Sequence, residues 1–260
     1  MDLQLKDKTA LVTGASRGIG LAVVEQLSAE GVRVVAVART STPELRATGA
    51  IVVPADLGLA GGPEQAVAAA LAAAGELDLL VNNVGGGEGD LGAGFLEYDD
   101  AAWESIFGLN YFATVRVTRA ALPSLIKQQG AIVNLSSIGA RIPSSGPVPY
   151  TTAKAALTAL GKALAEEFGP QGVRVNTVSP AAVRTALWTS PEGYGGQLAQ
   201  RLGVPQEHLL AALPQETGMI TGRLIEPAEV AALVVQLCSP LTASITGADY
   251  LIDAGSSKSA

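Results

Sequence analysis

Short apolar segments rich in β-branched residues alternate with longer alanine-rich segments along the 260 residues. Near-continuous apolar runs are typical of strands that are covered on both faces, as in a parallel sheet. The predicted strands are Thr9–Thr13, Val32–Val37, Ile51–Pro54, Leu77–Asn82, Ala131–Ser136, Val173–Ser179 and Ala248–Ile252. The predicted helices are Gly18–Glu30, Pro63–Gly75, Ala101–Gln128, Tyr150–Phe168 and Ala228–Leu237. Strand alternating with helix predicts an α/β fold with a doubly wound parallel sheet of seven strands and helices on both faces.

No linker, repeat or change in composition divides the chain, so we expect one domain spanning residues 1–260. Two segments lack a regular pattern. Gly85–Gly94, with the sequence GGGEGDLGAG, predicts a flexible loop after a strand. Ala186–Gly222 contains Pro191, Pro205 and Pro214 and predicts a long irregular excursion. Because long irregular segments of compact domains are often functional, we expect residues 186–222 to form a substrate lid.

Composition narrows the classes of function. The chain has 17 Lys and Arg against 24 Asp and Glu, a net charge of −7, which argues against a nucleic-acid-binding surface. One cysteine and one histidine exclude an intrachain disulfide framework, thiolate clusters and metal sites with two imidazoles, and weaken the case for a Ser-His-Asp hydrolase. The N-terminus has no signal-like apolar core, and no apolar run of about 18 residues predicts a membrane span. We therefore expect a cytoplasmic protein that binds no metal, membrane or nucleic acid.

A glycine-rich turn at residues 14–20, with the sequence GASRGIG, follows the first predicted strand and opens the first predicted helix. Glycines at this place let a diphosphate approach bare N–H groups at a helix N-terminus. Their spacing differs from the general G-x-G-x-x-G fingerprint, and glycine is common in this chain. The strand–turn–helix context favours a dinucleotide site.

The end of the second predicted strand bears on the choice of cofactor. NAD-selective folds place an acid here for the ribose 2′-hydroxyl, whereas this chain has Ala38 followed by Arg39. Arg39 and Arg17 would together pair strongly with a 2′-phosphate, which predicts NADP(H). The alternative is that both arginines are solvated surface residues.

Tyr150 and Lys154 are four residues apart and share one face of a predicted helix. A nearby ammonium favours the tyrosinate and so lowers the pKa of the phenol, which suits a proton donor. Ser137, at the end of a predicted strand, has a hydroxyl that can stabilise a carbonyl oxygen as negative charge develops on it.

Together these motifs resemble the short-chain dehydrogenase/reductase family. Order and spacing match along almost the whole chain, including Asn82-Asn83-Val84-Gly85 and the C-terminal residues 245–255. The resemblance implies a single-domain Rossmann fold with catalytic residues Asn110, Ser137, Tyr150 and Lys154. It implies the cofactor-binding residues Gly14, Ser16, Arg17, Gly18, Ile19, Gly20, Arg39, Asp56, Leu57, Asn83, Gly85, Tyr150, Lys154, Pro180, Val183 and Thr185.

The resemblance also implies reversible hydride transfer between NADP(H) and a keto or secondary alcohol group of a small-molecule substrate. Tyr150 would be the general acid, Lys154 would lower its pKa and hold the nicotinamide ribose, and Ser137 would steady the substrate oxygen. Asn110 would anchor a water for proton resupply. Family members are commonly dimers or tetramers joined through helices that match Ala101–Gln128 and Tyr150–Phe168, so a homodimer or homotetramer is expected.

Three positions depart from the family pattern. Val84 stands in place of alanine, and Ala181 and Ala254 stand in place of glycines. An alanine makes any positive-φ conformation costly. None of the three is a reacting group, so the departures concern fine geometry.

Two rival functions remain beside the leading one. A 3-oxoacyl carrier-protein reductase would favour basic residues near the site mouth, and the chain shows no clear basic cluster. A non-catalytic NADP-binding regulator has no need of an intact Ser-Tyr-Lys set. The apolar residues of the lid favour an apolar substrate, and His208 within it is expected to be a surface residue.

Overall fold

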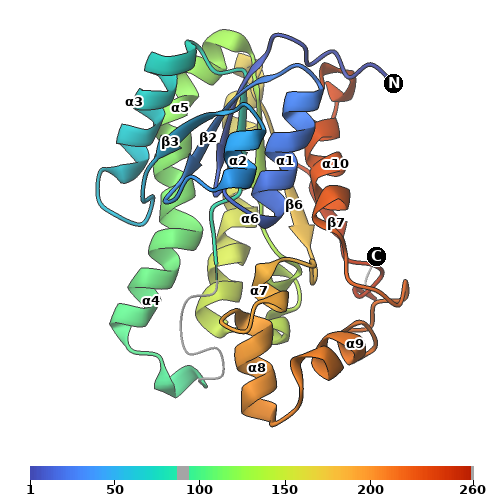
Figure 1. Ribbon diagram of the computed structural model, residues 1–260. Helices are drawn as coiled ribbons and strands as arrows, with labels where there is room; N and C mark the ends of the chain where they lie inside the picture. The colour runs from blue at the N-terminus through green and yellow to red at the C-terminus, as the bar shows by residue number, and fades with distance from the viewer. Residues whose placement is uncertain (87–93, 259–260) are drawn as a thin grey trace.

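A seven-stranded parallel sheet runs through the molecule (Figure 1), and this computed structural model describes residues 1–86 and 94–258. The strands are β1 (Thr9–Thr13), β2 (Arg33–Ala38), β3 (Ile51–Pro54), β4 (Leu79–Asn82), β5 (Ala131–Leu135), β6 (Arg174–Pro180) and β7 (Asp249–Ile252). Their spatial order is β3-β2-β1-β4-β5-β6-β7, and every neighbouring pair is parallel. The predicted doubly wound sheet is confirmed.

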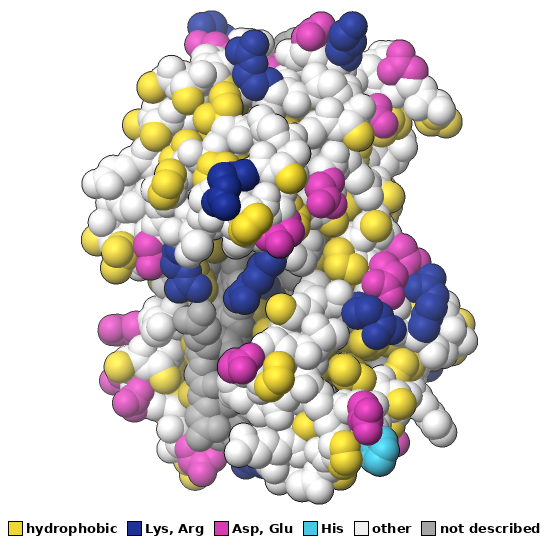
Figure 2. Space-filling view, viewed as in Figure 1, with side chains coloured by type: hydrophobic (Ala, Val, Ile, Leu, Met, Phe, Trp, Pro, Cys, Tyr) yellow, Lys and Arg dark blue, Asp and Glu magenta, His cyan; other side chains and the backbone are white. Residues whose placement is uncertain are grey.

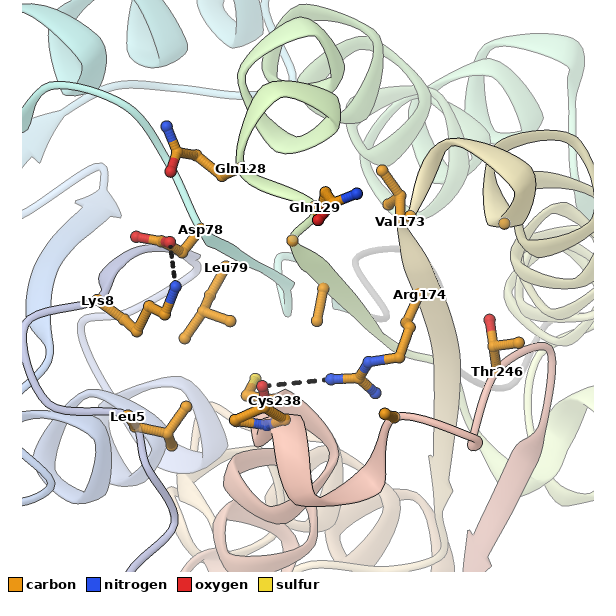
Figure 3. A pocket seen from close by; sticks show the side chains of 16 residues that line it. Leu5, Lys8, Asp78, Leu79, Gln128, Gln129, Val173, Arg174, Cys238 and Thr246 are labelled. Atoms are coloured by element: carbon orange, nitrogen blue, oxygen red, sulfur yellow. Dashed lines mark hydrogen bonds and ion pairs between the residues drawn. The ribbon is translucent and has the colours of Figure 1, made fainter.

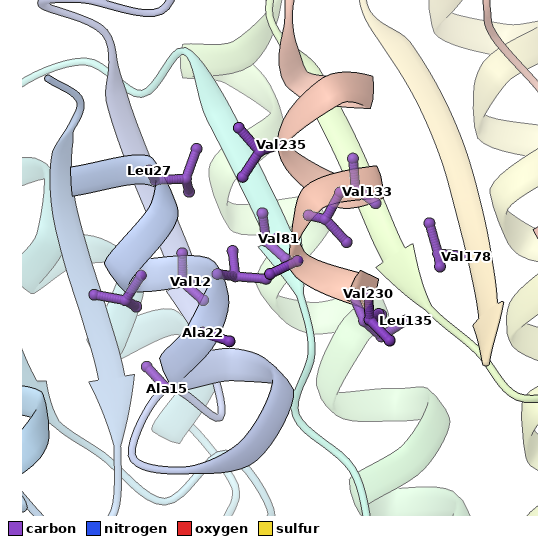
Figure 4. Packing of buried hydrophobic residues seen from close by; sticks show 14 of the residues in the cluster. Val12, Ala15, Ala22, Leu27, Val81, Val133, Leu135, Val178, Val230 and Val235 are labelled. Carbon is purple, nitrogen blue, oxygen red and sulfur yellow. The ribbon is translucent and has the colours of Figure 1, made fainter. Parts of the chain in front are cut away.

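Helices cover both faces of the sheet. They are α1 (Gly18–Ala29), α2 (Pro43–Ala47), α3 (Gly62–Ala74), α4 (Asp100–Phe107), α5 (Ala113–Gln128), α6 (Val148–Phe168), α7 (Ala186–Thr189), α8 (Tyr194–Leu202), α9 (Gln206–Glu216) and α10 (Pro227–Cys238). Successive strand residues point to opposite faces. Val12 of β1 (Figure 4) and Ala10 accordingly lie in the core shared with α1 and α10, whereas Leu11 lies in the core shared with α3 and α5. Burial on both faces explains why the strand segments are apolar throughout.

The predicted helix Ala101–Gln128 is interrupted. A π-helical turn, η2 (Gly108–Phe112), separates α4 from α5. The carboxamide of Asn110 donates through Nδ2 to the carbonyl oxygen of Ile106 at 3.0 Å, so a side chain occupies an acceptor of the helix ladder. Side chains that insert into the ladder in this way widen a helix locally. Asn110 is 1% exposed, and its carboxamide lies inside the protein, bonded to the backbone of Gly86.

The prediction of an irregular excursion over Ala186–Gly222 is wrong, because three helices, α7, α8 and α9, lie within it. Pro191 lies in the turn between α7 and α8, Pro205 is the N-cap of α9 and Pro214 lies inside α9, so none of the three prevents these helices from forming. Figure 1 shows the three helices grouped at the end of the molecule toward which the strands point. The predicted loop Gly85–Gly94 falls largely on residues 87–93, outside the described residues.

The base of the segment 186–222 is pinned at both ends. Val183 forms a parallel bridge with Ile225, and the Arg184 N–H donates to the Ile225 carbonyl at 2.8 Å. Near the chain terminus, the Ile220 N–H donates to the Ala254 carbonyl at 2.8 Å. The helices between these anchors therefore start from a fixed base.

Of the two alanines that replace family glycines, only one is in a left-handed conformation. Ala254 has φ +54°, whereas Ala181 is not among the residues with positive φ. The left-handed region costs an L residue with a Cβ about 1–2 kcal/mol. Backbone strain from these departures is therefore confined to Ala254.

We expect Ala254→Gly to leave the free energy of unfolding unchanged or raise it by about 0.5 kcal/mol, because relief of the strain offsets the added flexibility of the unfolded chain. The matched change Ala181→Gly relieves no strain and only makes the unfolded chain more flexible, so it should lower the free energy of unfolding by about 0.5–1 kcal/mol. Urea titration of the two variants measures the difference, and a greater loss in Ala254→Gly would contradict it.

Candidate active site

The predicted site residues gather at the carboxyl edge of the sheet. Gly14 follows β1, Arg39 follows β2, and Asn83 follows β4 directly. The strand order reverses between β1 and β4, since β2 and β3 lie on one side of β1 and β4 lies on the other. Crevices at such a reversal are where open α/β sheets bind ligands.

The glycine turn is fastened to the loop after β4. The Thr13 hydroxyl accepts from the N–H groups of Asn83 and Val84 at 3.0 and 3.1 Å. In return, Asn83 Nδ2 donates to the carbonyl oxygens of Thr13 and Gly14, both at 3.0 Å. These four bonds join the ends of two neighbouring strands into one rigid unit.

The glycines of the turn leave no room for side chains. A Cβ on Gly20 would lie 2.3 Å from the Gly14 carbonyl oxygen, and a Cβ on Gly14, at φ +64°, would lie 2.9 Å from Asn83 Nδ2. Gly18, at φ +58°, would bring a Cβ to 3.0 Å from the methyl group of Thr185, which follows β6. The turn and Thr185, another of the predicted cofactor-binding residues, are thus in contact across the edge of the sheet.

The start of α1 suits an anion. Its N-cap residue, Arg17, makes no side-chain hydrogen bond to the first turn, which keeps the backbone N–H groups there available. Ser16 and Ile19 flank Gly18 and are partly buried, whereas Arg17 and Arg39 are exposed. Bare N–H groups, tight glycines and a helix N-terminus are what a cofactor diphosphate needs, so these residues fit the predicted dinucleotide.

The remaining predicted cofactor residues line the same edge. Leu57 after β3 is buried, and the Asp56 carboxylate beside it accepts from the Gly58 N–H at 2.9 Å. Pro180 ends β6, and Val183 is buried in the bridge to Ile225.

Tyr150, Ser137 and Lys154 meet where β5 ends and α6 begins. Ser137 is the N-cap of a 3₁₀ turn, η3 (Ile138–Ala140), and its Oγ accepts from the Gly139 N–H at 3.1 Å. Because that bond uses a lone pair, the Ser137 proton remains available for donation. Burial raises the pKa of Tyr150, and a side-chain hydrogen bond with Ser137 opposes the rise.

Lys154 lies one turn further along α6 and is 3% exposed. Its Nζ donates to the Leu135 carbonyl at 2.8 Å and lies 5.8 Å from the centre of the Tyr150 ring. Burial lowers its pKa to about 8. A Cβ on Gly85 would lie 3.1 Å from this nitrogen and 2.9 Å from Asn110 Oδ1, so Gly85 gives the two polar groups a shared space.

The expected effect of Lys154 on the Tyr150 phenol is absent in this structure. The pKa of Tyr150 is raised rather than lowered, because burial outweighs the opposing hydrogen bond with Ser137. Burial therefore favours the protonated form of the Tyr150 phenol.

Asn110 reaches the site from the π-turn. Its Oδ1 accepts from the Gly86 N–H at 3.0 Å, and its Nδ2 donates to the Gly86 carbonyl at 2.8 Å. The carboxamide therefore fastens the chain that leaves β4 alongside Lys154. No local sequence pattern indicates this reciprocal pair.

Two residues outside the predicted set also shape the site. Thr13 is fully buried and joins the glycine turn to Asn83, and its place directly before Gly14 was the available sequence signal. Ser136 donates to the Lys154 carbonyl at 3.0 Å and hydrogen bonds to Thr158 at 2.8 Å, which ties β5 to α6. Its position next to Ser137 carries no distinguishing pattern.

His208 takes no part in this arrangement. It is exposed on α9 and lies on the surface (Figure 2), as predicted. Within residues 1–86 and 94–258, no group of three or more His, Cys, Asp or Glu side chains is placed to hold a metal ion. Among the same residues, no helix combines the length and apolar character needed to cross a membrane.

Comparison with known proteins agrees with this geometry. A family model described as enoyl-(acyl carrier protein) reductase matches residues 14–257. Short-chain reductase protein NovJ of Streptomyces niveus is 34% identical, with 96% of this chain and 94% of NovJ covered. D-threitol dehydrogenase of Mycolicibacterium smegmatis is also 34% identical, with 98% and 94% covered. The structure of L-sorbose reductase from Gluconobacter frateurii, complexed with NADPH and L-sorbose, superimposes with a TM-score of 0.90 at 30% identity and covers 100% of both chains.

The fold and the site define an oxidoreductase that acts on CH–OH groups and uses a nicotinamide cofactor. The chain belongs to the short-chain dehydrogenase/reductase family.

Burial of Lys154 carries a cost in stability that depends on pH. Its folded-state pKa of about 8 lies below the ordinary 10.5. Below pH 8 the ammonium is charged in both states and its burial cost is complete; between about 8 and 10.5 the unfolded chain binds the extra proton, so stability rises with pH.

We expect Lys154→Met to have a free energy of unfolding about 1–3 kcal/mol higher than that of the parent at pH 7. The difference should shrink between pH 8 and 10. Lys162→Met, an exposed change on the same helix, is the control and should show no such trend. Denaturant melts at several pH values measure both, and a difference independent of pH would contradict the buried charge.

Proposed function

We propose that this protein is an NADP(H)-dependent oxidoreductase that transfers a hydride between the nicotinamide and a keto or secondary alcohol group of a small, largely apolar substrate. The observation that carries the proposal is the grouping of Ser137, Tyr150 and Lys154 beside the glycine turn at the carboxyl edge of the sheet. We treat residues 1–260 as one catalytic domain and residues 186–222 as its substrate lid.

The cofactor would lie across the reversal in strand order. The turn at residues 14–20 would hold its diphosphate, Asp56 and Leu57 would contact the adenine, and Pro180, Val183 and Thr185 would hold the nicotinamide end. Asn83 and Gly85 would line the middle, since Asn83 supports the turn and Gly85 opens space beside Lys154. When bound, the nicotinamide supplies or accepts the hydride.

Tyr150 is the general acid in the direction of reduction. Its raised pKa keeps the phenol protonated at neutral pH, so it can give a proton to the carbonyl oxygen of the substrate. The Ser137 hydroxyl, oriented by the Gly139 N–H, donates to the same oxygen and stabilises the charge that develops there. In oxidation the same groups work in reverse.

Lys154 holds the ribose hydroxyls of the nicotinamide end and returns a proton to Tyr150. With a pKa of about 8, its ammonium can both donate and recover a proton near neutral pH. Both amide hydrogens of Asn110 serve backbone carbonyls, but Oδ1 retains a second lone pair. A water held there would link Lys154 to solvent.

A preference for NADP(H) rests on Arg39 and Arg17. Arg39 follows β2 where no acid is present, and both side chains are exposed on the edge that carries the glycine turn. Guanidinium groups form charge-assisted pairs with phosphate oxygens. NADPH is bound in the solved L-sorbose reductase and in an actinorhodin polyketide ketoreductase variant that superimposes with a TM-score of 0.86 at 30% identity.

The lid favours an apolar substrate. Trp188 of α7 and Tyr194 of α8 form an edge-to-face pair with ring centres 4.9 Å apart. Gln206 Nε2 donates to the carbonyl of Trp188 at 2.7 Å and so fixes α7 to α9. A closed lid of this kind would exclude water from the reaction.

A 3-oxoacyl carrier-protein reductase remains the second candidate. The observation in its favour is that such an enzyme from Vibrio cholerae, FabG, is 32% identical, with 97% of this chain covered. An acidic net charge of −7 works against it, because its carrier would need a basic docking surface. Activity on acyl-carrier substrates alone would favour this candidate, and NADPH binding without turnover of any carbonyl would favour a regulator.

We also propose a homodimer or homotetramer joined through α4, α5 and α6. Ala155, Ala159 and Ala163 form an exposed row of small residues along α6, which would allow close approach of a second helix. Phe112 ends η2, which packs against α6, and is 43% exposed, so an apolar ring is also available to a second subunit.

An NADPH oxidation screen against cyclic ketones, β-keto esters and diketones tests the proposed reaction. We expect turnover with at least one ketone and loss of at least 10³-fold in kcat in Tyr150→Phe, because the proton donor is gone. NADPH binding, followed by fluorescence, should be retained in the variant. Full activity of Tyr150→Phe would remove Tyr150 from its role.

Cofactor preference has a separate test. Arg39→Asp should weaken NADPH binding by about 10- to 100-fold, since a carboxylate would repel the 2′-phosphate, and should change NADH binding little. Arg33→Asp, at the opposite end of the same strand, is the control. Equal effects of Arg39→Asp on both cofactors would remove the argument for NADP(H).

A further inference from the structure

An ion pair connects the catalytic turn to the edge strand of the sheet. Arg141 lies four residues after Ser137, and Asp249 is the first residue of β7. Arg141 Nε donates to Asp249 Oδ2 at 3.0 Å, and a second guanidinium nitrogen lies 2.9 Å from the same oxygen. The Asp249 side chain is only 11% exposed, so solvent screens this pair less than it screens most surface pairs.

The chain between Ser137 and Arg141 is a single rigid turn. The Ala140 N–H donates to the Ser137 carbonyl at 3.0 Å, and the N–H groups of Arg141 and Ile142 both donate to the Ile138 carbonyl at 2.9 Å. Ser137 Oγ is itself held by the Gly139 N–H. Whatever fixes Arg141 in space therefore fixes the direction of the Ser137 hydroxyl.

The other oxygen of Asp249 reaches the opposite wall of the site. The Ser179 hydroxyl, which is fully buried, donates to Asp249 Oδ1 at 2.6 Å. Ser179 directly precedes Pro180, the last residue of β6 and the first residue proposed to hold the nicotinamide end. One carboxylate thus joins the turn that carries Ser137 to the strand that carries the cofactor.

We infer that Arg141 and Asp249 are positioning residues for the reaction: their ion pair, continued through Ser179, sets the distance between the Ser137 hydroxyl and the hydride-bearing end of the cofactor. The inference rests on the proposed function. Neither residue touches a reacting atom; both act through the turn and through β6. A displacement of about 1 Å between reacting groups can cost about 100-fold in rate, so a connection of this kind matters for turnover.

The chain contains a matched ion pair far from the site. Lys8 and Asp78 meet at the amino edge of the sheet (Figure 3), with Nζ 2.8 Å from Oδ1. Their side chains are 42% and 14% exposed, against 44% and 11% for Arg141 and Asp249. The second oxygen of Asp78 also accepts a bond, from the Thr9 N–H at 2.9 Å. The two ion pairs are similar in distance and burial. They differ in position, because Arg141 and Asp249 adjoin the turn that carries Ser137, whereas Lys8 and Asp78 lie at the amino edge of the sheet.

The test compares Arg141→Ala and Asp249→Asn with Lys8→Ala in the full chain. Asp249→Asn keeps an oxygen for Ser179 and removes the charge that holds Arg141, which limits the risk of misfolding. Steady-state kinetics with NADPH and the best ketone of the screen give kcat and both KM values. Hydrogen exchange measured without cofactor reports on the amides of residues 140–142.

We expect kcat to fall about tenfold or more in Arg141→Ala and Asp249→Asn, with KM for NADPH within about twofold of the parent. Exchange at residues 140–142 should become faster, and Arg141→Lys should recover part of kcat because it restores the charge with one donor. Lys8→Ala should change neither kcat nor the exchange at residues 140–142. The inference is overturned if Arg141→Ala matches Lys8→Ala in kcat, or if kcat falls while exchange at the turn is unchanged.

Ser137→Ala and Tyr150→Phe separate this inference from the proposed function. If both are inactive while Arg141→Ala behaves like Lys8→Ala, only the positioning role fails. If both retain full activity, the proposed mechanism itself fails.

Discussion

The bonds that join the ends of β1 and β4 are the constraint on which the site depends. Four hydrogen bonds join residues 13–14 to residues 83–84 at the point where the strand order reverses: the Thr13 hydroxyl accepts two, and Asn83 Nδ2 donates two. They set the glycine turn on one side and start the chain toward Gly85 and Gly86 on the other. Asn110 then fastens Gly86, and Lys154 lies beside Gly85. The glycine turn and the buried Lys154 are thereby built on one connected network.

Burial of Lys154 shifts its pKa and at the same time lowers the stability of the fold. An ammonium that is 3% exposed is costly to bury, and its pKa falls to about 8 as a result. The surrounding structure meets part of that cost with the carbonyl of Leu135. The same burial raises the pKa of Tyr150, so the pKa values of the two residues move apart and the phenol becomes the weaker acid. Their functional values arise from the environment rather than from the residues alone.

The local hydrophobic pattern was sufficient to predict the strands of the sheet but not all of the helices around it. All seven strands were predicted, because burial on both faces leaves a continuous apolar run. The helix over residues 101–128 was predicted without its π-turn, since a side chain that bonds to its own helix leaves no mark in hydrophobic periodicity. The helices of residues 186–222 were missed because prolines in a short turn, at an N-cap or tolerated inside a helix look the same in a sequence as prolines that break helices.

The sequence by itself determined the fold class, the glycine turn, the Tyr150-x-x-x-Lys154 spacing and the place of Ser137, because each depends on residues close together in the chain or on a recognisable order of motifs. Tertiary structure alone decided which way the pKa values of Tyr150 and Lys154 move, since desolvation depends on what packs around them. It also decided that Asp249 meets Arg141, 108 positions away, because only the arrangement of parallel strands brings β7 to the catalytic turn.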